Sequence, residues 1–179
     1  MRYFPLFIDT QNLPCLIVGA GEVAARKLEL LLKSEAQVTV VAPEICGTVR
    51  HLASSAQVSL HQRPFENSDL DHVRVVFVAT SDEALNAEIH AEATARGLLV
   101  NVVDNTPLCG FITPSIIDRS PLVIAMSSGG HAPVLLRYMR QKLESLIPAN
   151  ISKLGAFSER FRNKVKSSLA SVTARRYFW

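Results

Sequence analysis

The chain has 179 residues, a formal net charge of +3 and a hydrophobic share of 48%. These values are ordinary for a soluble globular protein, and they allow one substantial domain with a small extension. The sequence predicts no membrane-spanning segment, because no apolar run approaches the roughly 20 residues that a bilayer requires. Asp9 interrupts the short apolar N-terminus, so we expect no secretory signal and a cytoplasmic location.

Short apolar strands alternate with helices over the first two thirds of the chain. We predict strands over residues 14–19, 37–43, 57–65, 73–80 and 98–104. Helices are predicted after the first strand, over 44–56 and over 81–97, where Ser81 can cap the last of them. This alternation indicates a parallel sheet with right-handed crossovers, which is an α/β fold of the Rossmann type.

The pattern changes after residue 110. Two apolar stretches flank the turn-like run Asp118-Arg119-Ser120-Pro121 and predict a hairpin. A helix then runs from Pro133 to just before Pro148. Its apolar side chains share one face: Leu135, Met139, Leu143 and Leu146. This face is either a dimer interface or a surface that packs onto the chain's own core, and the pattern favours neither.

We therefore predict a Rossmann domain over 1–112, a dimerisation region over 113–148 and a basic helical region over 149–179. The last region contains many basic residues and one acidic residue, Glu159. The basic residues are Lys153, Arg160, Arg162, Lys164, Lys166, Arg175 and Arg176. Such a tail could attract a polyanion, or it could be a solvated helix face. No nucleic-acid motif accompanies it, so we expect no nucleic-acid partner.

A glycine motif joins the first strand to the first helix. Residues 19–24 read GAGEVA and match the pattern G-x-G-x-x-G/A. Gly19 suits a tight turn, Gly21 lets a pyrophosphate approach the backbone, and Ala24 lets the helix pack closely on the strand. The helix N-terminus then offers N–H groups and a partial positive charge to phosphates. We interpret the motif as a dinucleotide site, with a purely structural corner as the alternative.

The carboxylate that binds the ribose of a dinucleotide usually lies about 20 residues later, at the end of the second strand. Glu44 is the nearest acidic residue and could bind the ribose hydroxyls together with backbone groups of Pro43. No arginine follows the strand directly to meet a 2′-phosphate, since Arg50 lies several residues on, so we expect NAD rather than NADP. Thr80 and Ser81 end the fourth strand at the same edge and could line the cofactor.

Asp104 lies just past the fifth strand, at the edge of the sheet where α/β proteins bind ligands. Its carboxylate could act as a general base, or Asp104-Asn105 could form only a turn. The loop Ser127-Ser128-Gly129-Gly130 could bind substrate carboxylates through its N–H groups and hydroxyls.

The histidines show no metal-ligand spacing, and the three distant cysteines include no Cys-x-x-Cys pair. We therefore expect reduced thiols and no metal site.

Six stretches of the sequence together resemble one known family. They are GAGEVAARK (19–27), VVAPE (40–44), ATSDEALN (79–86), NVVD (101–104), FITPSIIDRSPLVIAMSSGGHAPVLLR (111–137) and KLESLIP (142–148). In order and spacing they resemble the precorrin-2 dehydrogenase/sirohydrochlorin ferrochelatase module of sirohaem synthase. The run PSIIDRSP followed by SSGG is much more specific than the glycine motif.

The resemblance implies a homodimer that oxidises precorrin-2 with NAD⁺ to sirohydrochlorin and then inserts ferrous iron, as a substrate, to give sirohaem. The catalytic aspartate of the family falls on Asp104. Cofactor contacts fall on Glu22, Val23, Pro43 and Glu44. Precorrin-2 carries several carboxylates, for which Arg119 and Arg137 are candidate partners, although Arg119 could simply complete the hairpin turn. His131 stands where many relatives have a small or hydroxyl residue, and we assign it no role.

In fused sirohaem synthases a similar basic and aromatic stretch continues into a uroporphyrinogen methyltransferase domain, for which these 179 residues have no room. The chain is then a module of a fused enzyme or a standalone form. Two other functions stay open, a NAD-sensing regulatory domain without catalysis and a dehydrogenase of a small metabolite. The first would not require the hairpin, the Ser-Ser-Gly-Gly loop or the basic tail, and the second would more naturally have a larger substrate domain.

Overall fold

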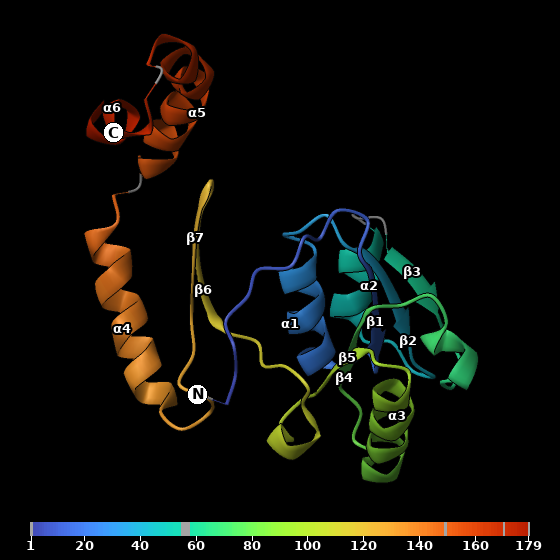
Figure 1. Cartoon of the computed structure of the whole chain (residues 1–179). Coiled ribbons are helices and arrows are strands. Elements are labelled where there is room, and N and C mark those ends of the chain that lie inside the picture. Colours follow the sequence, from blue (N-terminus) through green and yellow to red (C-terminus); the bar gives the residue numbers. More distant parts are fainter. Residues whose placement is uncertain (1, 55–57, 149, 170, 179) are drawn as a thin grey trace. The chain divides into compact units, whose positions relative to one another are not determined.

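The computed structural model describes residues 2–54, 58–148, 150–169 and 171–178 (Figure 1). The chain forms two compact units, Met1–Ile112 and Thr113–Trp179. The first contains a parallel sheet with helices, and the second contains a hairpin followed by helices, which confirms the predicted fold class. Within the part of the chain that is described, no helix is long and apolar enough to cross a membrane.

Five parallel strands form the sheet of the first unit, in the order β3-β2-β1-β4-β5. They are β1 (Pro14–Val18), β2 (Gln37–Val41), β3 (Val58–His61), β4 (Val75–Val78) and β5 (Leu99–Val102). The central strand is β1, where Ile17 pairs with Val40 on one side and with Phe77 on the other. The strand order reverses at β1, and in open α/β sheets this reversal leaves a crevice at the carboxyl ends of the strands.

Helices cover both faces of this sheet (Figure 1). They are α1 (Glu22–Leu31), α2 (Gly47–Ser54) and α3 (Glu83–Ala95), with the short 3₁₀ helices η1 (Asn67–Leu70) and η2 (Thr106–Leu108). Ala24 and Leu28 of α1 pack into the core on one face, and Ile89 and Ala93 of α3 pack into the core on the other. Because both faces are covered, the strands are almost continuously apolar and rich in β-branched residues.

Most predicted elements are slightly shorter in the structure, and two boundaries differ by three residues or more. The strand predicted over 57–65 is shorter, because β3 ends at His61, while Gln57 lies outside the described residues. Past that point the Arg63 guanidinium donates to the Asp69 carboxylate at 2.6 Å. This ion pair holds the chain next to η1, so the strand does not continue. The helix predicted from residue 44 begins only at Gly47, because the chain bends at residues 43–44 after β2.

The predicted hairpin is present in the second unit. Its strands, β6 (Ser115–Arg119) and β7 (Leu122–Met126), pair antiparallel. The Asp118 carboxylate accepts hydrogen bonds from the backbone N–H and the hydroxyl of Ser120, at 2.9 and 2.7 Å, and so shapes the turn. Three helices follow: α4 (Pro133–Leu146), α5 (Ile151–Ser168) and α6 (Val172–Phe178). The division predicted at residue 148 stays a prediction.

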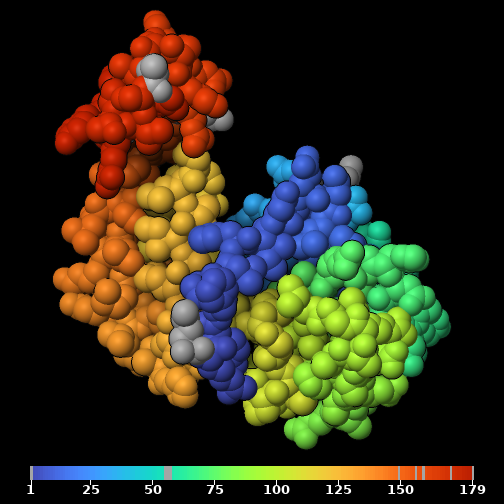
Figure 2. All heavy atoms as spheres, viewed as in Figure 1, coloured from blue at the N-terminus to red at the C-terminus, as the bar shows by residue number. Residues whose placement is uncertain are grey.

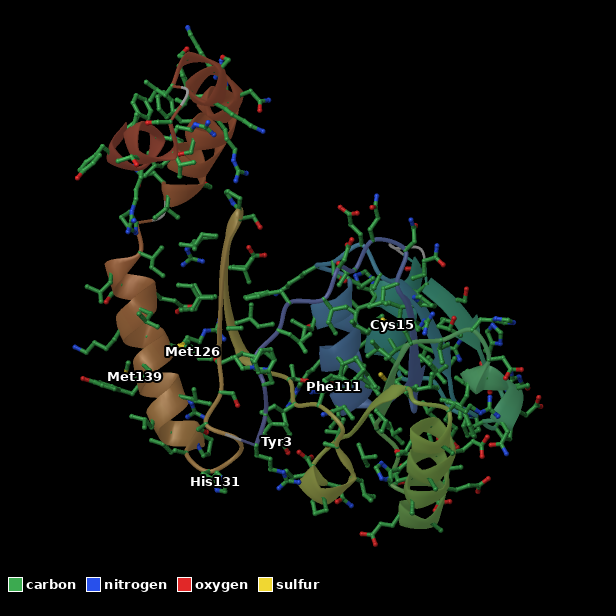
Figure 3. The ribbon with its side chains drawn as sticks, in the orientation of Figure 1. Tyr3, Cys15, Phe111, Met126, His131 and Met139 are labelled. Carbon is green, nitrogen blue, oxygen red and sulfur yellow. The ribbon has the colours of Figure 1, made fainter. Side chains whose placement is uncertain are left out.

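Apolar side chains of α4 lie at the surface of the second unit (orange in Figure 2). Leu135 is 57% exposed and Leu146 is 73% exposed. Val134, Tyr138 and Met139 are also exposed along this helix, and Met139 is labelled in Figure 3. An uncovered apolar stretch of this kind is typical of a surface that binds a partner.

Candidate active site

A cleft of about 660 Å³ opens at the carboxyl ends of β1, β2, β4 and β5, and every residue that lines it belongs to the first unit. The cleft brings together all the predicted cofactor contacts and the predicted catalytic residue. They are Gly19, Gly21, Glu22, Val23, Pro43, Glu44, Thr80, Ser81 and Asp104. Residues from four separate loops thus meet at the sheet edge that the topology marks as the ligand edge.

Gly19 makes the tight turn after β1, and no larger residue fits there. Its φ is +100°, and an added Cβ would lie 2.3 Å from the carbonyl oxygen of Ala79. The Gly19 N–H donates to the Val41 carbonyl at 2.9 Å, which ties the turn to the end of β2. The glycine therefore lets the ends of β1 and β4 approach each other beneath the cleft.

Gly21 is the N-cap of α1, and it has a different role. Its φ of −85° is ordinary, no side chain caps the helix here, and an added Cβ would meet nothing within 4 Å. The glycine thus keeps open the space in front of the first turn, where a helix N-terminus attracts an anion. Ala24, only 1% exposed, lets α1 pack tightly on the sheet. These features fit the pyrophosphate of a dinucleotide.

The bend after β2 carries Pro43 and Glu44 and is held by Gln62, which directly follows β3. The Gln62 side-chain amide donates to the Pro43 carbonyl at 3.3 Å, and the Arg50 guanidinium donates to the Gln62 side-chain oxygen at 2.9 Å. Glu44 is exposed at the cleft. The sequence analysis missed Gln62, because its contact with Pro43 crosses between strands and no local spacing signals it.

The loop after β4 is fixed by Asn86, which is 9% exposed. The Thr80 hydroxyl donates to the Asn86 side-chain oxygen at 2.6 Å, and the Asn86 amide donates back to the Thr80 carbonyl at 3.2 Å. The predicted capping role of Ser81 was wrong. Asp82 caps α3, because it directly precedes the first helical residue and its carboxylate accepts the Leu85 N–H at 3.0 Å.

Asp104 is exposed, lines the cleft and lies in a turn. Its φ is +59°, and the Asn105 N–H donates to the Val102 carbonyl at 3.2 Å across this turn. Asp104 is therefore part of a turn and also lines the cleft, and its role as a general base stays a prediction.

A half-buried lysine contributes to the electrostatics around Asp104. The Lys27 ammonium of α1 lies 5.6 Å from the centre of the Phe77 ring, and that ring contacts Phe111 edge to face at 5.3 Å. Burial lowers the pKa of the Lys27 ammonium, while the negative charge of Asp104 acts to raise it. The sequence analysis missed Lys27, for which the one signal was a basic residue one turn after the glycine motif.

The predicted substrate contacts lie in the second unit, where the serine and glycine loop leads from β7 into α4. The Ser127 hydroxyl accepts the Gly129 N–H at 2.9 Å, and the Ser128 hydroxyl accepts the Ala132 N–H at 3.1 Å. Gly129 and Gly130 have φ of +64° and +89°. His131, labelled in Figure 3, lies in the same loop and is exposed.

The two predicted arginine contacts also lie in the second unit. Arg119 donates from Nη1 to the Asp118 carbonyl at 3.0 Å, and its Nε is buried without a hydrogen-bond partner in the described structure. Arg137 is exposed on α4. The substrate role of these two arginines stays a prediction, as does that of the loop. The described residues contain no group of three or more His, Cys, Asp or Glu side chains that could hold a metal ion.

Comparison with known proteins assigns the chain to a family. The family described as Putative NAD(P)-binding matches residues 6–115, and the Sirohaem synthase dimerisation region matches residues 150–179. The second match lies in the stretch that was predicted as basic and helical. It falls outside residues 113–148, which were predicted as the dimerisation region, so both segments are candidates for the dimer interface.

Named relatives point the same way. Over all 179 residues the chain is 66% identical to the siroheme synthase of Pseudoalteromonas atlantica (strain T6c / ATCC BAA-1087) and 47% identical to siroheme synthase 1 of Serratia proteamaculans (strain 568). It spans 39% and 38% of the length of these proteins. The solved structure of SirC, precorrin-2 dehydrogenase, has the same fold, with a TM-score of 0.80 and 23% identity over 98% of this chain and 86% of that one. The resemblance to the sirohaem synthase module is confirmed, and the chain belongs to the Putative NAD(P)-binding family.

Proposed function

We propose that the chain is an NAD-dependent precorrin-2 dehydrogenase that also inserts ferrous iron into the product, sirohydrochlorin, to give sirohaem. The observation that carries the proposal is the position of Asp104 in the same cleft as the Gly19–Gly21 turn. This arrangement supports an acid–base group that acts beside a dinucleotide site. The names of the relatives at 66% and 47% identity support the substrate class.

Different residues of the cleft would bind different parts of the dinucleotide. Gly19, Gly21 and the first turn of α1 would hold the pyrophosphate, because the backbone is open there and the helix N-terminus is positive. The Glu44 carboxylate would accept hydrogen bonds from the ribose hydroxyls and repel a 2′-phosphate, which favours NAD over NADP. Thr80 and Ser81 would line the other half of the cofactor. When bound, NAD⁺ supplies the hydride acceptor.

Asp104 would handle the proton of the dehydrogenation. Oxidation of precorrin-2 removes one hydride and one proton, and an exposed carboxylate at the cleft can take up that proton if it lies within hydrogen-bond reach of the substrate. For metal insertion the pyrrole nitrogens must lose protons as the substrate iron enters, and the same carboxylate would accept them. One carboxylate in one cleft therefore serves both steps.

The second unit would bind the substrate periphery and join two copies of the chain. The loop over 127–130 offers N–H groups and hydroxyls, and Arg119 and Arg137 offer guanidinium groups, to the carboxylates of the macrocycle. The exposed apolar face of α4 and the matched dimerisation region over 150–179 support a homodimer. In longer relatives a fused methyltransferase domain would continue the chain.

The test is an anaerobic incubation of the purified chain with precorrin-2 and NAD⁺, in which NADH and the tetrapyrrole spectrum are followed together. We expect NADH and sirohydrochlorin to form in equal amounts, and added Fe²⁺ to convert the product to sirohaem. NAD binding without any turnover would overturn the proposal and favour a NAD-sensing regulatory domain. Turnover with NADP alone would overturn the assignment of the cofactor.

A further inference from the structure

The turn that holds Asp104 has an unusual backbone conformation. It spans Val102 to Asn105 and is closed by the Asn105 N–H, which donates to the Val102 carbonyl at 3.2 Å. Asp104 is its third residue and has a φ of +59°, in the left-handed region that glycine and asparagine favour at this position. Aspartate is one of the few non-glycine residues that adopt this conformation, and neighbouring contacts decide how firmly it is kept. The neighbours of this turn therefore bear on function.

Cys109 holds both ends of this turn. Its thiol lies 3.1 Å from the Val102 carbonyl oxygen and 3.3 Å from the Asn105 carbonyl oxygen, and its single proton is shared between them. These two carbonyls stand on either side of Asp104 along the chain. Burial raises the pKa of the Cys109 thiol above its ordinary value, so the thiol keeps its proton and stays a donor at neutral pH.

Asn101 holds Cys109 in turn. The two residues form an isolated antiparallel bridge, and the Asn101 amide donates to the Phe111 carbonyl at 2.9 Å and lies 3.5 Å from the Cys109 sulfur. Asn101 is 6% exposed, and Phe111 (labelled in Figure 3) packs its ring against Phe77. Both ends of the segment from 102 to 109 are thus fastened to the core of the first unit.

We propose that Cys109 is a positioning residue, which Asn101 anchors and which fixes the turn that presents the Asp104 carboxylate to the cleft. Cys109 is not among the residues that line the cleft, so it would act through the turn that carries Asp104. The inference rests on the proposed function, because it assumes that the position of this carboxylate matters for turnover.

The experiment compares Cys109→Ala with Cys109→Ser in the whole chain. Alanine removes the donor, so the turn loosens and kcat for precorrin-2 oxidation falls about tenfold, as small displacements of catalytic groups do, while KM and NAD affinity change little. Serine keeps a donor and restores most of kcat. Cys46→Ala is the matched control, since Cys46 is also a half-buried free thiol but lies in another loop. Amide hydrogen exchange at Asn105 reports on the turn without any turnover, and it should quicken in Cys109→Ala alone.

Each outcome decides one point. An alanine variant with unchanged kcat overturns the role of Cys109 in turnover. A fall in kcat with unchanged exchange at Asn105 overturns the action through the turn, as does a serine variant no better than alanine with its fold intact by circular dichroism. Failure of the unmodified chain to form NADH overturns the proposed function itself, and this result is distinct from the others because it needs no variant.

Discussion

The two units of the chain bury their apolar residues very differently. Helices cover both faces of the sheet in the first unit, and its cores hold nearly all the buried apolar side chains of the described residues. Ile117 and Val165 are the buried apolar residues that the described part of the second unit contributes, whereas α4 leaves Val134, Leu135 and Leu146 more than half exposed. The first unit therefore has a large apolar core of its own, although Phe4, Leu6 and Phe7 of its N-terminal segment are exposed, while the helix α4 of the second unit has an apolar surface that suits a partner.

Gly19→Ala should destabilise the first unit most severely. The added methyl would lie 2.3 Å from a backbone carbonyl at a φ of +100°, so we expect a loss of about 3 kcal/mol in the free energy of unfolding, measured by urea denaturation, and loss of NAD binding. Gly21→Ala is the matched control, because its Cβ meets nothing within 4 Å. It should unfold within about 0.5 kcal/mol of the unmodified chain and still bind NAD more weakly. Equal stability of both variants would contradict the distinction between the two glycines.

Asp104→Asn should show that the chemistry resides in the first unit. Asparagine tolerates a left-handed φ, so the turn is kept while the proton acceptor is lost. We expect kcat to fall by about 10²–10⁴, with NAD affinity unchanged in a binding titration. Glu44→Gln offers the contrast, since it should raise KM for NAD about tenfold and leave kcat alone. Full activity of the asparagine variant would remove Asp104 from the mechanism.

The same contrast between units explains what the sequence could predict. The sheet, the glycine turn and the placement of Asp104 followed from local patterns, because buried parallel strands are continuously apolar and Gly19 sits between a strand and a helix. The cap of α3 was assigned one residue early, since Ser81 and Asp82 are both good capping residues and only the helix start separates them. Gln62 and Cys109 were not foreseen, because their contacts depend on how separate segments meet. The apolar face of α4 was foreseen, but periodicity cannot tell which surface covers it.

Leu135→Glu should affect the second unit alone. If the exposed face of α4 joins two copies, a charge placed there is costly, and we expect the dimer to dissociate with a Kd raised at least about tenfold, measured by analytical ultracentrifugation. NAD binding and the stability of the first unit should not change. Gln141→Glu is the control, because it adds the same charge at an exposed polar position of the same helix. If Leu135→Glu left the oligomeric state unchanged, the interface would have to lie elsewhere, with residues 150–179 the next candidate.

Asp69→Asn should have the smallest effect, and it tests the first unit through its acid dependence. The Arg63 guanidinium, by hydrogen bonding, holds the pKa of the Asp69 carboxyl below its ordinary value of 3.8, and the Glu66 N–H adds to this at 2.9 Å. A lowered folded-state pKa contributes stability that is present above the unfolded pKa and lost as the pH falls through the folded one. The variant should therefore melt about 2 °C lower at pH 7, since the pair is partly open to solvent, and this difference should vanish at strongly acidic pH. Asp71→Asn changes the same charge at a more exposed carboxylate, 56% against 8%, and should shift Tm less. A Tm difference that persisted at strongly acidic pH would mean that Asp69 stabilises η1 by packing and not by its charge.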